Sequence, residues 1–122
     1  MIHYVGDASQ PLHTATRVSK LLPDGDRGGN DFPLQYHYGV NELHALYDTL
    51  LYTLSHPINI PEVARNLTQK HQSTITATDL LFVPFQWVAE SHALAQSLYE
   101  NITENSQPSE SYIAEHKQPI ER

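Results

Sequence analysis

The chain has 122 residues, a formal net charge of −7, 39% hydrophobic residues and a mean hydropathy of −0.45. This composition is typical of a globular protein and excludes a disordered chain or one made of membrane-spanning segments, since no apolar run approaches the roughly 20 residues that a bilayer requires. The negative charge argues against a protein that holds nucleic acid through a basic surface, because neutralising phosphates requires Lys and Arg.

The first predicted element is a helix at the N-terminus that ends near Asp7. His3 and Asp7 lie four positions apart and therefore share one helical face, where both can reach the same cation. Gly6 permits the helix to end there, and Pro11 cannot continue it. The turn that follows can bring His13 back towards the same point. This stretch therefore predicts a cup of two imidazoles and one carboxylate.

The next stretch, residues 14 to 31, is predicted to be a loop. Turn-forming residues occupy positions 23 to 26, and Gly28-Gly29 permits backbone conformations with positive φ. One interpretation is that this backbone approaches a metal cluster or a bound phosphate, with Asn30 nearby but not as a ligand. The alternative is a surface turn that leads into a strand, and spacing alone does not decide between them.

A short strand or hairpin arm is predicted for residues 32 to 38, and Gly39 closes it. Apolar and aromatic side chains alternate there with polar ones, a period of two that is typical of a half-buried strand. The apolar positions of this pattern are Phe32, Leu34, Tyr36 and Tyr38. His37 lies on the polar face and is interpreted as a solvent-exposed histidine.

An amphipathic helix of about three to four turns is predicted from Glu42 onward, with Asn41 as its N-cap. Its apolar positions recur at helical spacing: Leu43, Leu46, Leu50, Leu51 and Leu54. On this helix, His44 and Asp48 repeat the i, i+4 arrangement of the first helix. The sequence therefore places a second imidazole and carboxylate on one helical face.

Two His/Asp pairs and His13 form a ligand set of nitrogen and oxygen atoms, and the chain has no cysteine. Such a set suits hydrolytic rather than structural zinc. Either pair alone is common on helix surfaces, but both pairs together with His13 are hard to attribute to coincidence. Five ligands exceed the needs of one tetrahedral ion and therefore indicate neighbouring ions. Four other histidines have no His or acidic partner at i, i+4 and are interpreted as structural or surface residues: His56, His71, His92 and His116.

Three motifs resemble the S1/P1 nuclease family, in this order and at this spacing: HYVGDASQPLH at residues 3–13, GDRGGND at residues 25–31 and NELHALYD at residues 41–48. Members of this family are zinc-dependent phosphodiesterases with a trinuclear site. A later predicted helix is similar to one of the family through Trp87, Glu90, Ser91, Leu94, Ala95 and Tyr99.

The resemblance implies a ligand set for Zn²⁺. His13, His44 and Asp48 bind one zinc ion together and leave its fourth position open. His3 and Asp7 bind a second ion, and Asp7 also bridges to a third. Three ions are implied for the intact family site, and this chain supplies a complete set of protein ligands for about one of them.

The predicted fold is all-α: a helical bundle of the phospholipase C/P1 nuclease type, with one small strand or hairpin between the two ligand-bearing helices. Later helices are predicted from Pro61, from Pro84 and around Tyr112, with Pro119 interrupting the last one. No signal peptide precedes the metal motif. Residues 1–122 are therefore expected to be a partial domain that lacks the family's N-terminal portion and final helix.

The resemblance implies a zinc-dependent endonuclease/3′-nucleotidase that hydrolyses phosphodiester and phosphomonoester bonds in single-stranded DNA or RNA and in 3′-nucleotides. As a fragment, this stretch is expected to show little activity by itself and to self-associate if truncated. A secreted, lumenal or periplasmic protein without stable membrane contact is implied, and sequons at Asn66 and Asn101 agree with a glycoprotein. Two alternatives stay open: a zinc phospholipase C-like phosphoesterase, or a non-catalytic zinc-binding or interaction fragment.

Overall fold

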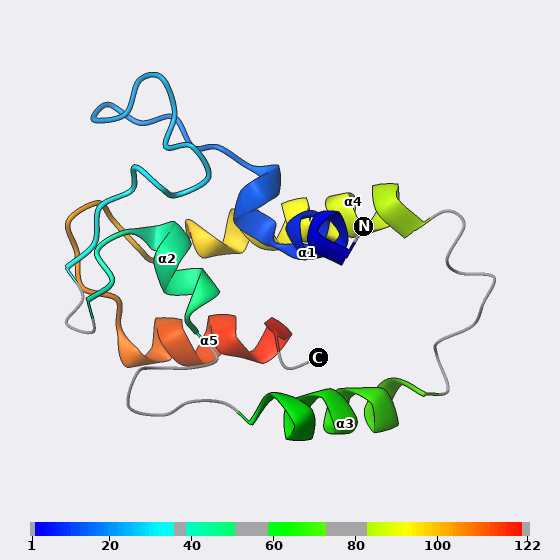
Figure 1. Cartoon of the computed structure of the whole chain (residues 1–122). Coiled ribbons are helices and arrows are strands. Elements are labelled where there is room, and N and C mark those ends of the chain that lie inside the picture. Colours follow the sequence, from blue (N-terminus) through cyan, green and yellow to red (C-terminus); the bar gives the residue numbers. More distant parts are fainter. Residues whose placement is uncertain (1, 36–38, 51–58, 73–82, 121–122) are drawn as a thin grey trace.

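A computed structural model describes residues 2–35, 39–50, 59–72 and 83–120. Its elements are α1 (Ile2–Ser9), the 3-10 helix η1 (Pro11–Thr14), α2 (Leu43–Asp48), α3 (Ile60–His71), α4 (Val83–Leu98) and α5 (Glu110–Ile120), shown in Figure 1. No strand occurs within the described ranges, which confirms the predicted all-α class. None of the helices in these ranges is both long and apolar enough to cross a bilayer.

α1 is longer than predicted and continues past Gly6. A glycine in a helix costs about 1 kcal/mol relative to alanine, which weakens the helix without ending it. The chain turns at Gln10, whose side-chain oxygen accepts a hydrogen bond from the His13 N–H at 3.2 Å and so caps η1. Pro11 follows at the first position of η1, where a missing N–H costs nothing. The turn therefore lies at Gln10-Pro11 and places His13 on η1.

α1 and η1 pack side by side against α4 (Figure 1). Ser91 Oγ donates a hydrogen bond to the Ala8 carbonyl at 2.7 Å, near the end of α1. The next residue, His92, donates from Nδ1 to the Thr14 carbonyl at 3.0 Å, at the end of η1. Consecutive residues of α4 thus fix the two elements that carry His3, Asp7 and His13.

The hydrophobic core joins η1, the following loop, α2 and α5 to the C-terminal end of α4. Its buried side chains are Leu12, Phe32, Leu34, Leu43, Leu46, Leu50, Leu98, Ile102 and Tyr112. The N-terminal half of α4 is less covered, since Phe85 is 89% exposed. Apolar side chains in the N-terminal half of α4 are therefore only partly buried against the described residues.

The strand or hairpin arm predicted for residues 32 to 38 is wrong for the part of that segment that the structure describes; the remainder lies outside the described residues. Leu34 donates its N–H to the Asn41 carbonyl at 2.8 Å, whereas Gln35 donates to the Ser106 carbonyl at 2.9 Å. Because neighbouring residues pair with different segments, the segment makes isolated bridges instead of a ladder.

α2 differs from its prediction at the N-cap. Glu42 occupies that position without a side-chain cap, whereas the Asn41 carbonyl accepts the hydrogen bond from Leu34. That pairing holds Asn41 in the segment before the helix. The Thr49 hydroxyl donates back to the helix, to the Ala45 carbonyl at 2.8 Å. α2 ends at Asp48, and Thr49 and Leu50 lie in a turn, so the predicted helix of three to four turns is wrong for the described residues. The part of the prediction beyond Leu50 lies outside them.

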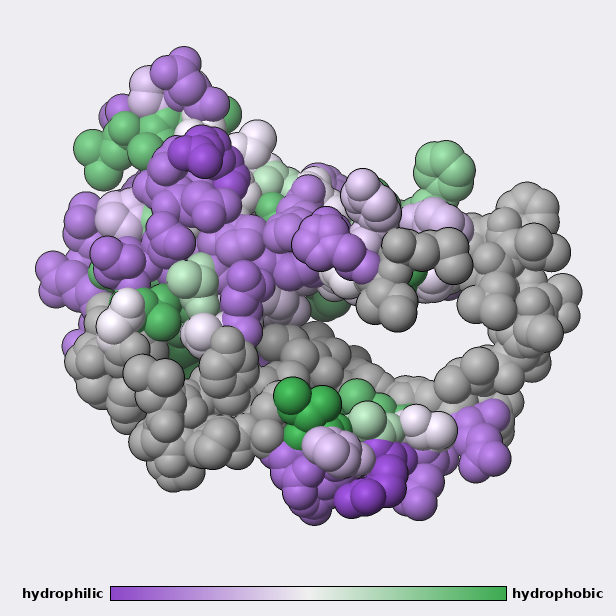
Figure 2. Space-filling model, viewed as in Figure 1, coloured by the Kyte–Doolittle hydropathy of each residue, from purple (hydrophilic) through white to green (hydrophobic). Residues whose placement is uncertain are grey.

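The helices predicted from Pro61, from Pro84 and around Tyr112 occur as α3, α4 and α5, with one correction. α5 continues through Pro119, so the predicted interruption there is wrong. Pro119 stands in the last turn, where it removes few intrahelical hydrogen bonds. α3 contains Pro61 in its first turn, and Asn59 caps it by accepting from the Glu62 N–H at 3.3 Å. Figure 2 shows the hydrophobic side chains of α3 on one side and its hydrophilic ones on the other, so the helix is amphipathic.

Candidate metal centre

His44 is held from the protein side of its ring. It lies on α2, and its side chain is 15% exposed. Its Nδ1 lies 2.8 Å from the carbonyl oxygen of Gly28. A carbonyl only accepts hydrogen bonds, so Nδ1 carries the proton of the neutral ring. The lone pair is then on Nε2, on the side of Asp48, which is the arrangement in which a histidine binds a metal.

Two glycines allow the loop before α2 to reach His44. Gly28 and Gly29 have φ angles of 67° and 80°, as predicted. A Cβ atom on Gly28 would collide with the carbonyl oxygen of Leu12, so only glycine permits this approach to η1. The Gly29 carbonyl also accepts from the backbone N–H of His44 at 3.2 Å. The loop therefore contacts the candidate site, as one of its two interpretations predicted.

Asn30 supports the same loop and does not point a ligand atom at the site. Its Nδ2 donates to the Arg27 carbonyl at 2.8 Å. The same nitrogen lies 3.3 Å from His44 Nδ1. Because that ring nitrogen carries a proton, both groups are hydrogen-bond donors, and they form no hydrogen bond with each other.

Gln10 is the residue of the site that the sequence did not reveal. Its Nε2 donates to Asp48 Oδ1 at 3.0 Å and lies 3.4 Å from His44 Nε2. Its oxygen faces away, towards the backbone N–H groups of η1. The amide group therefore presents its positive end to two acceptors, a nitrogen and a carboxylate oxygen. A cation would satisfy the same two acceptors.

His13, Asp7 and His3 extend this cluster across η1 and α1. The rings of His13 and His44 stack with centroids 5.0 Å apart. His13 Nδ1 lies 3.5 Å from Asp7 Oδ1, and His3 Nε2 lies 3.3 Å from Asp7 Oδ2. With His44 and Asp48, whose Nε2 and Oδ2 atoms are 3.6 Å apart, the five predicted ligands form a continuous row of neighbours.

The donor set fits zinc in chemistry. Imidazole nitrogens and carboxylate oxygens are zinc ligands, and the row supplies three of the first and two of the second. Within the part of the chain that the structure describes, no three of these groups converge on one point closely enough to hold an ion. The row is thus arranged as a set of pairs, of which the His44–Asp48 pair already faces a common donor, the Gln10 amide.

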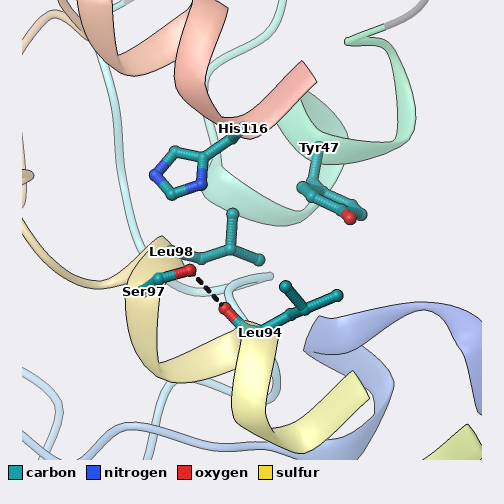
Figure 3. A pocket seen from close by; sticks show the side chains of 5 residues that line it. All are labelled: Tyr47, Leu94, Ser97, Leu98 and His116. Carbon is teal, nitrogen blue, oxygen red and sulfur yellow. Dashed lines mark hydrogen bonds between the residues drawn. The ribbon is translucent and has the colours of Figure 1, made fainter. Parts of the chain in front are cut away.

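A small pocket lies beside α2 but does not suit a nucleotide. Figure 3 shows the five side chains that line it: Tyr47, Leu94, Ser97, Leu98 and His116. Its cavity volume is about 10 Å³, about the smallest that can hold one water molecule. It is interpreted as a packing gap between α2, α4 and α5.

Of the other histidines whose side chains the structure describes, His92 contacts the Thr14 carbonyl and His116 lies on α5, so neither belongs to the row. His116 is buried on α5, with its ring 4.3 Å from that of Tyr112. Burial lowers the pKa of His116, and the charges of Glu115 and Glu100 oppose that shift. The structural interpretation of this residue is therefore confirmed. His37 and His56 lie outside the described residues.

A family model described as S1/P1 Nuclease matches residues 1–122, which is the whole chain. The chain belongs to the S1/P1 nuclease family, and the predicted resemblance is confirmed. This membership indicates a hydrolase that acts on nucleic acids. No curated protein and no solved structure matches the chain.

Proposed function

We propose that the chain carries a site for zinc-dependent hydrolysis of phosphodiester and phosphomonoester bonds, with single-stranded DNA or RNA and 3′-nucleotides as substrates. His13, His44 and Asp48 would hold one zinc ion. His3 and Asp7 would contribute to a second, and Asp7 would bridge to a third. The observation that carries this proposal is the His44–Asp48 pair, whose two acceptor atoms share the Gln10 amide as a common donor.

Bound zinc supplies Lewis-acid chemistry and activates water near neutral pH. The residues of this chain contribute position and charge. His44 offers Nε2 because Gly28 fixes the proton on Nδ1. Asp7 and Asp48 offset the positive charge of the ions, and Asp7 lies between His3 and His13, where one carboxylate can serve two neighbours.

The charge of the chain supports a site in which metal ions hold the phosphate. The formal net charge is −7, with seven Lys and Arg against fourteen Asp and Glu. A backbone of phosphates is repelled by such a surface unless cations neutralise it locally. The exposure of the row agrees with a strand substrate, since the side chain of His3 is 83% exposed and the site lies at the surface.

A secreted glycoprotein is part of the same proposal. Asn66 and Asn101, the acceptors of the two sequons, are both exposed, so a glycan at either position would extend into solvent. Attachment at these positions is tested by the mass of protein made in a secreting host, before and after treatment with a glycosidase.

Zinc stoichiometry and nucleotide release test the proposed function together. The chain is loaded with zinc, desalted and analysed for metal, and single-stranded DNA is then followed for acid-soluble products. We expect bound zinc and slow hydrolysis that a chelator stops. Release of head groups from phosphatidylcholine without release of nucleotides would favour a phospholipase C-like activity, and zinc binding without either product would favour a non-catalytic role.

A further inference from the structure

Asp26 is a carboxylate that the proposed chemistry does not use, and its residue is 0% exposed. It lies in the loop before α2, two positions from the glycine whose carbonyl fixes the ring of His44. A buried charge is costly unless hydrogen bonds satisfy it. The partners of Asp26 therefore show what this residue holds together.

Each oxygen of Asp26 faces a different part of the fold. Oδ1 accepts from the Arg17 N–H at 2.8 Å and from the Thr16 hydroxyl at 3.2 Å, both within the loop. Oδ2 accepts from the Tyr99 hydroxyl at 2.6 Å, just after the end of α4. The carboxylate thus joins the loop to α4, the helix on which η1 and α1 also pack.

The loop side of this junction continues to the candidate site. The Thr16 oxygen that donates to Asp26 also accepts from the Arg27 N–H at 3.2 Å. Arg27 directly precedes Gly28, whose carbonyl receives the proton of His44 Nδ1. Four hydrogen bonds and the Arg27–Gly28 peptide link therefore connect Tyr99 to the ring of His44.

The Tyr99 side of the junction is firm as well. Burial, and after it the hydrogen bond to Asp26, raise the pKa of the Tyr99 phenol, so at neutral pH the hydroxyl keeps its proton and donates it to Asp26. The Arg17 guanidinium lies 5.6 Å from the ring centroids of both Phe32 and Tyr99, which packs the same loop against α4.

We infer that the buried Asp26–Tyr99 pair is a positioning device for His44: it anchors the loop so that the Gly28 carbonyl holds the imidazole in the form that offers Nε2 to a metal. The inference rests on the proposed function only for the metal, since the form of the ring exists without it. Partners of this kind behind a ligand alter metal affinity by about 10- to 100-fold when they are lost.

The test compares two phenols that each donate one hydrogen bond in the core. Tyr99→Phe removes the bond to Asp26, and Tyr112→Phe removes the bond of Tyr112 to the Leu98 carbonyl, at 2.5 Å, without touching the loop. Thr16→Val provides a milder break in the same connection and carries the test if Tyr99→Phe does not fold. All three are made in the full 122-residue chain.

Two readouts separate positioning from stability. Nitrogen-15 NMR of metal-free protein near pH 8 reports which nitrogen of His44 carries the proton, and competition with a chromophoric chelator gives the Kd for zinc. In the unaltered chain we expect the proton on Nδ1. In Tyr99→Phe and Thr16→Val we expect a mixture of the two forms and zinc binding weakened by about tenfold. In Tyr112→Phe we expect a lower Tm, an unchanged His44 signal and a Kd within about twofold.

The outcomes distinguish this inference from the proposed function. An unaltered His44 signal in both Tyr99→Phe and Thr16→Val, or an equal weakening of zinc binding in Tyr112→Phe, would overturn the inference. Neither result would contradict the proposed zinc site. No zinc binding by the unaltered chain would overturn the proposed function, while the NMR comparison would still decide the role of Asp26 and Tyr99.

Discussion

His44 and His3 each lie four residues before an aspartate, on α2 and α1 respectively, and the fold treats the two pairs differently. The His44 side chain is 15% exposed, and Gly28 and Gln10 contact its two ring nitrogens. The His3 side chain is 83% exposed and contacts Asp7 and the ring of Tyr4, a neighbour in its own helix. Equal spacing in sequence therefore gives unequal preorganisation, because residues outside its own helix hold the ring of His44, whereas the contacts of the His3 ring with Asp7 and Tyr4 lie within its own helix.

This difference predicts which of the two His/Asp pairs binds a metal ion more tightly. A ligand that is already oriented loses little conformational entropy on binding, whereas an exposed side chain must be ordered at that moment. The His44–Asp48 pair, next to His13, is therefore expected to bind zinc more tightly than the His3–Asp7 pair. Substitutions at the two pairs test this difference in affinity.

The largest expected effect is that of Asp48→Asn. This change keeps the size of the side chain and removes the negative charge that the His44–Asp48 pair offers to a cation. Zinc content should fall by about one ion per chain, with affinity at least about 100-fold weaker, and hydrolysis of single-stranded DNA should fall to the level without zinc. Metal analysis after desalting and nucleotide release measure the two effects.

Glu90→Gln is the matched control for the loss of one negative charge. Glu90 is exposed on α4, where it accepts from Gln86 at 2.7 Å, and it lies outside the row of ligands. It should leave zinc content and hydrolysis unchanged. If Asp48→Asn retains the unaltered stoichiometry and rate, Asp48 is not a ligand.

The second prediction is a count of ions. In the proposed site, the His44–Asp48 pair and His13 would give one zinc ion three protein ligands, whereas His3 and Asp7 would give the next ion only two. We expect at most about one firmly bound zinc per chain after desalting, and we expect His3→Asn to leave that ion in place with its Kd within about threefold. Three ions that survive desalting, or loss of the firm ion in His3→Asn, would contradict the contrast between the pairs.

The third prediction concerns Gln10, which faces the His44–Asp48 pair. Gln10→Glu keeps an oxygen for the N–H groups of η1 and replaces the donor amide with a second oxygen. Without metal the new charge repels Asp48, so Tm should fall; with zinc it adds attraction, so affinity should rise by about tenfold. Calorimetry with and without zinc measures both signs. If Gln10→Glu changed stability in the same direction with and without zinc, the Gln10 amide would not occupy the position of a bound cation.

The sequence was sufficient for the features of the site that depend on local geometry. Spacing of four on a helix predicted both His/Asp pairs, and the pair of glycines predicted the positive φ angles. Gln10 could not be predicted, because its contacts join residues 34 and 38 positions away. The role of Asp26 could not be predicted either, since an aspartate that follows Gly25 in a stretch of turn-forming residues is typical of an exposed turn, and only tertiary packing buries it.

The errors in the predicted fold have the same physical origin. Alternation at residues 32 to 38 favours a strand, but a ladder needs a continuous partner, and Gln35 turns instead to Ser106 on a distant segment. The choice of partner is decided by packing and leaves no mark on local periodicity. Pro119 shows the converse, since the last turn of a helix tolerates a residue that would break its middle.

The smallest expected effect lies away from the row, at His116, and it tests whether acid acts on the fold as well as on the ligands. His116 is 5% exposed and borders the pocket with Tyr47, Ser97 and Leu98. Burial lowers its pKa in the folded protein, against the opposing charges of Glu115 and Glu100, whereas the unfolded chain retains the ordinary value of 6.5. Between these two pKa values the unfolded chain binds more protons.

Stability should therefore fall as the pH drops below 6.5, with the full loss reached below the lowered pKa. His116→Gln cannot take up this proton, so the drop in Tm of metal-free protein between about pH 7.5 and pH 5 should be smaller in that variant by a few degrees. Equal slopes in His116→Gln and in the unaltered chain would show that the charge of His116 does not differ between the folded and the unfolded chain.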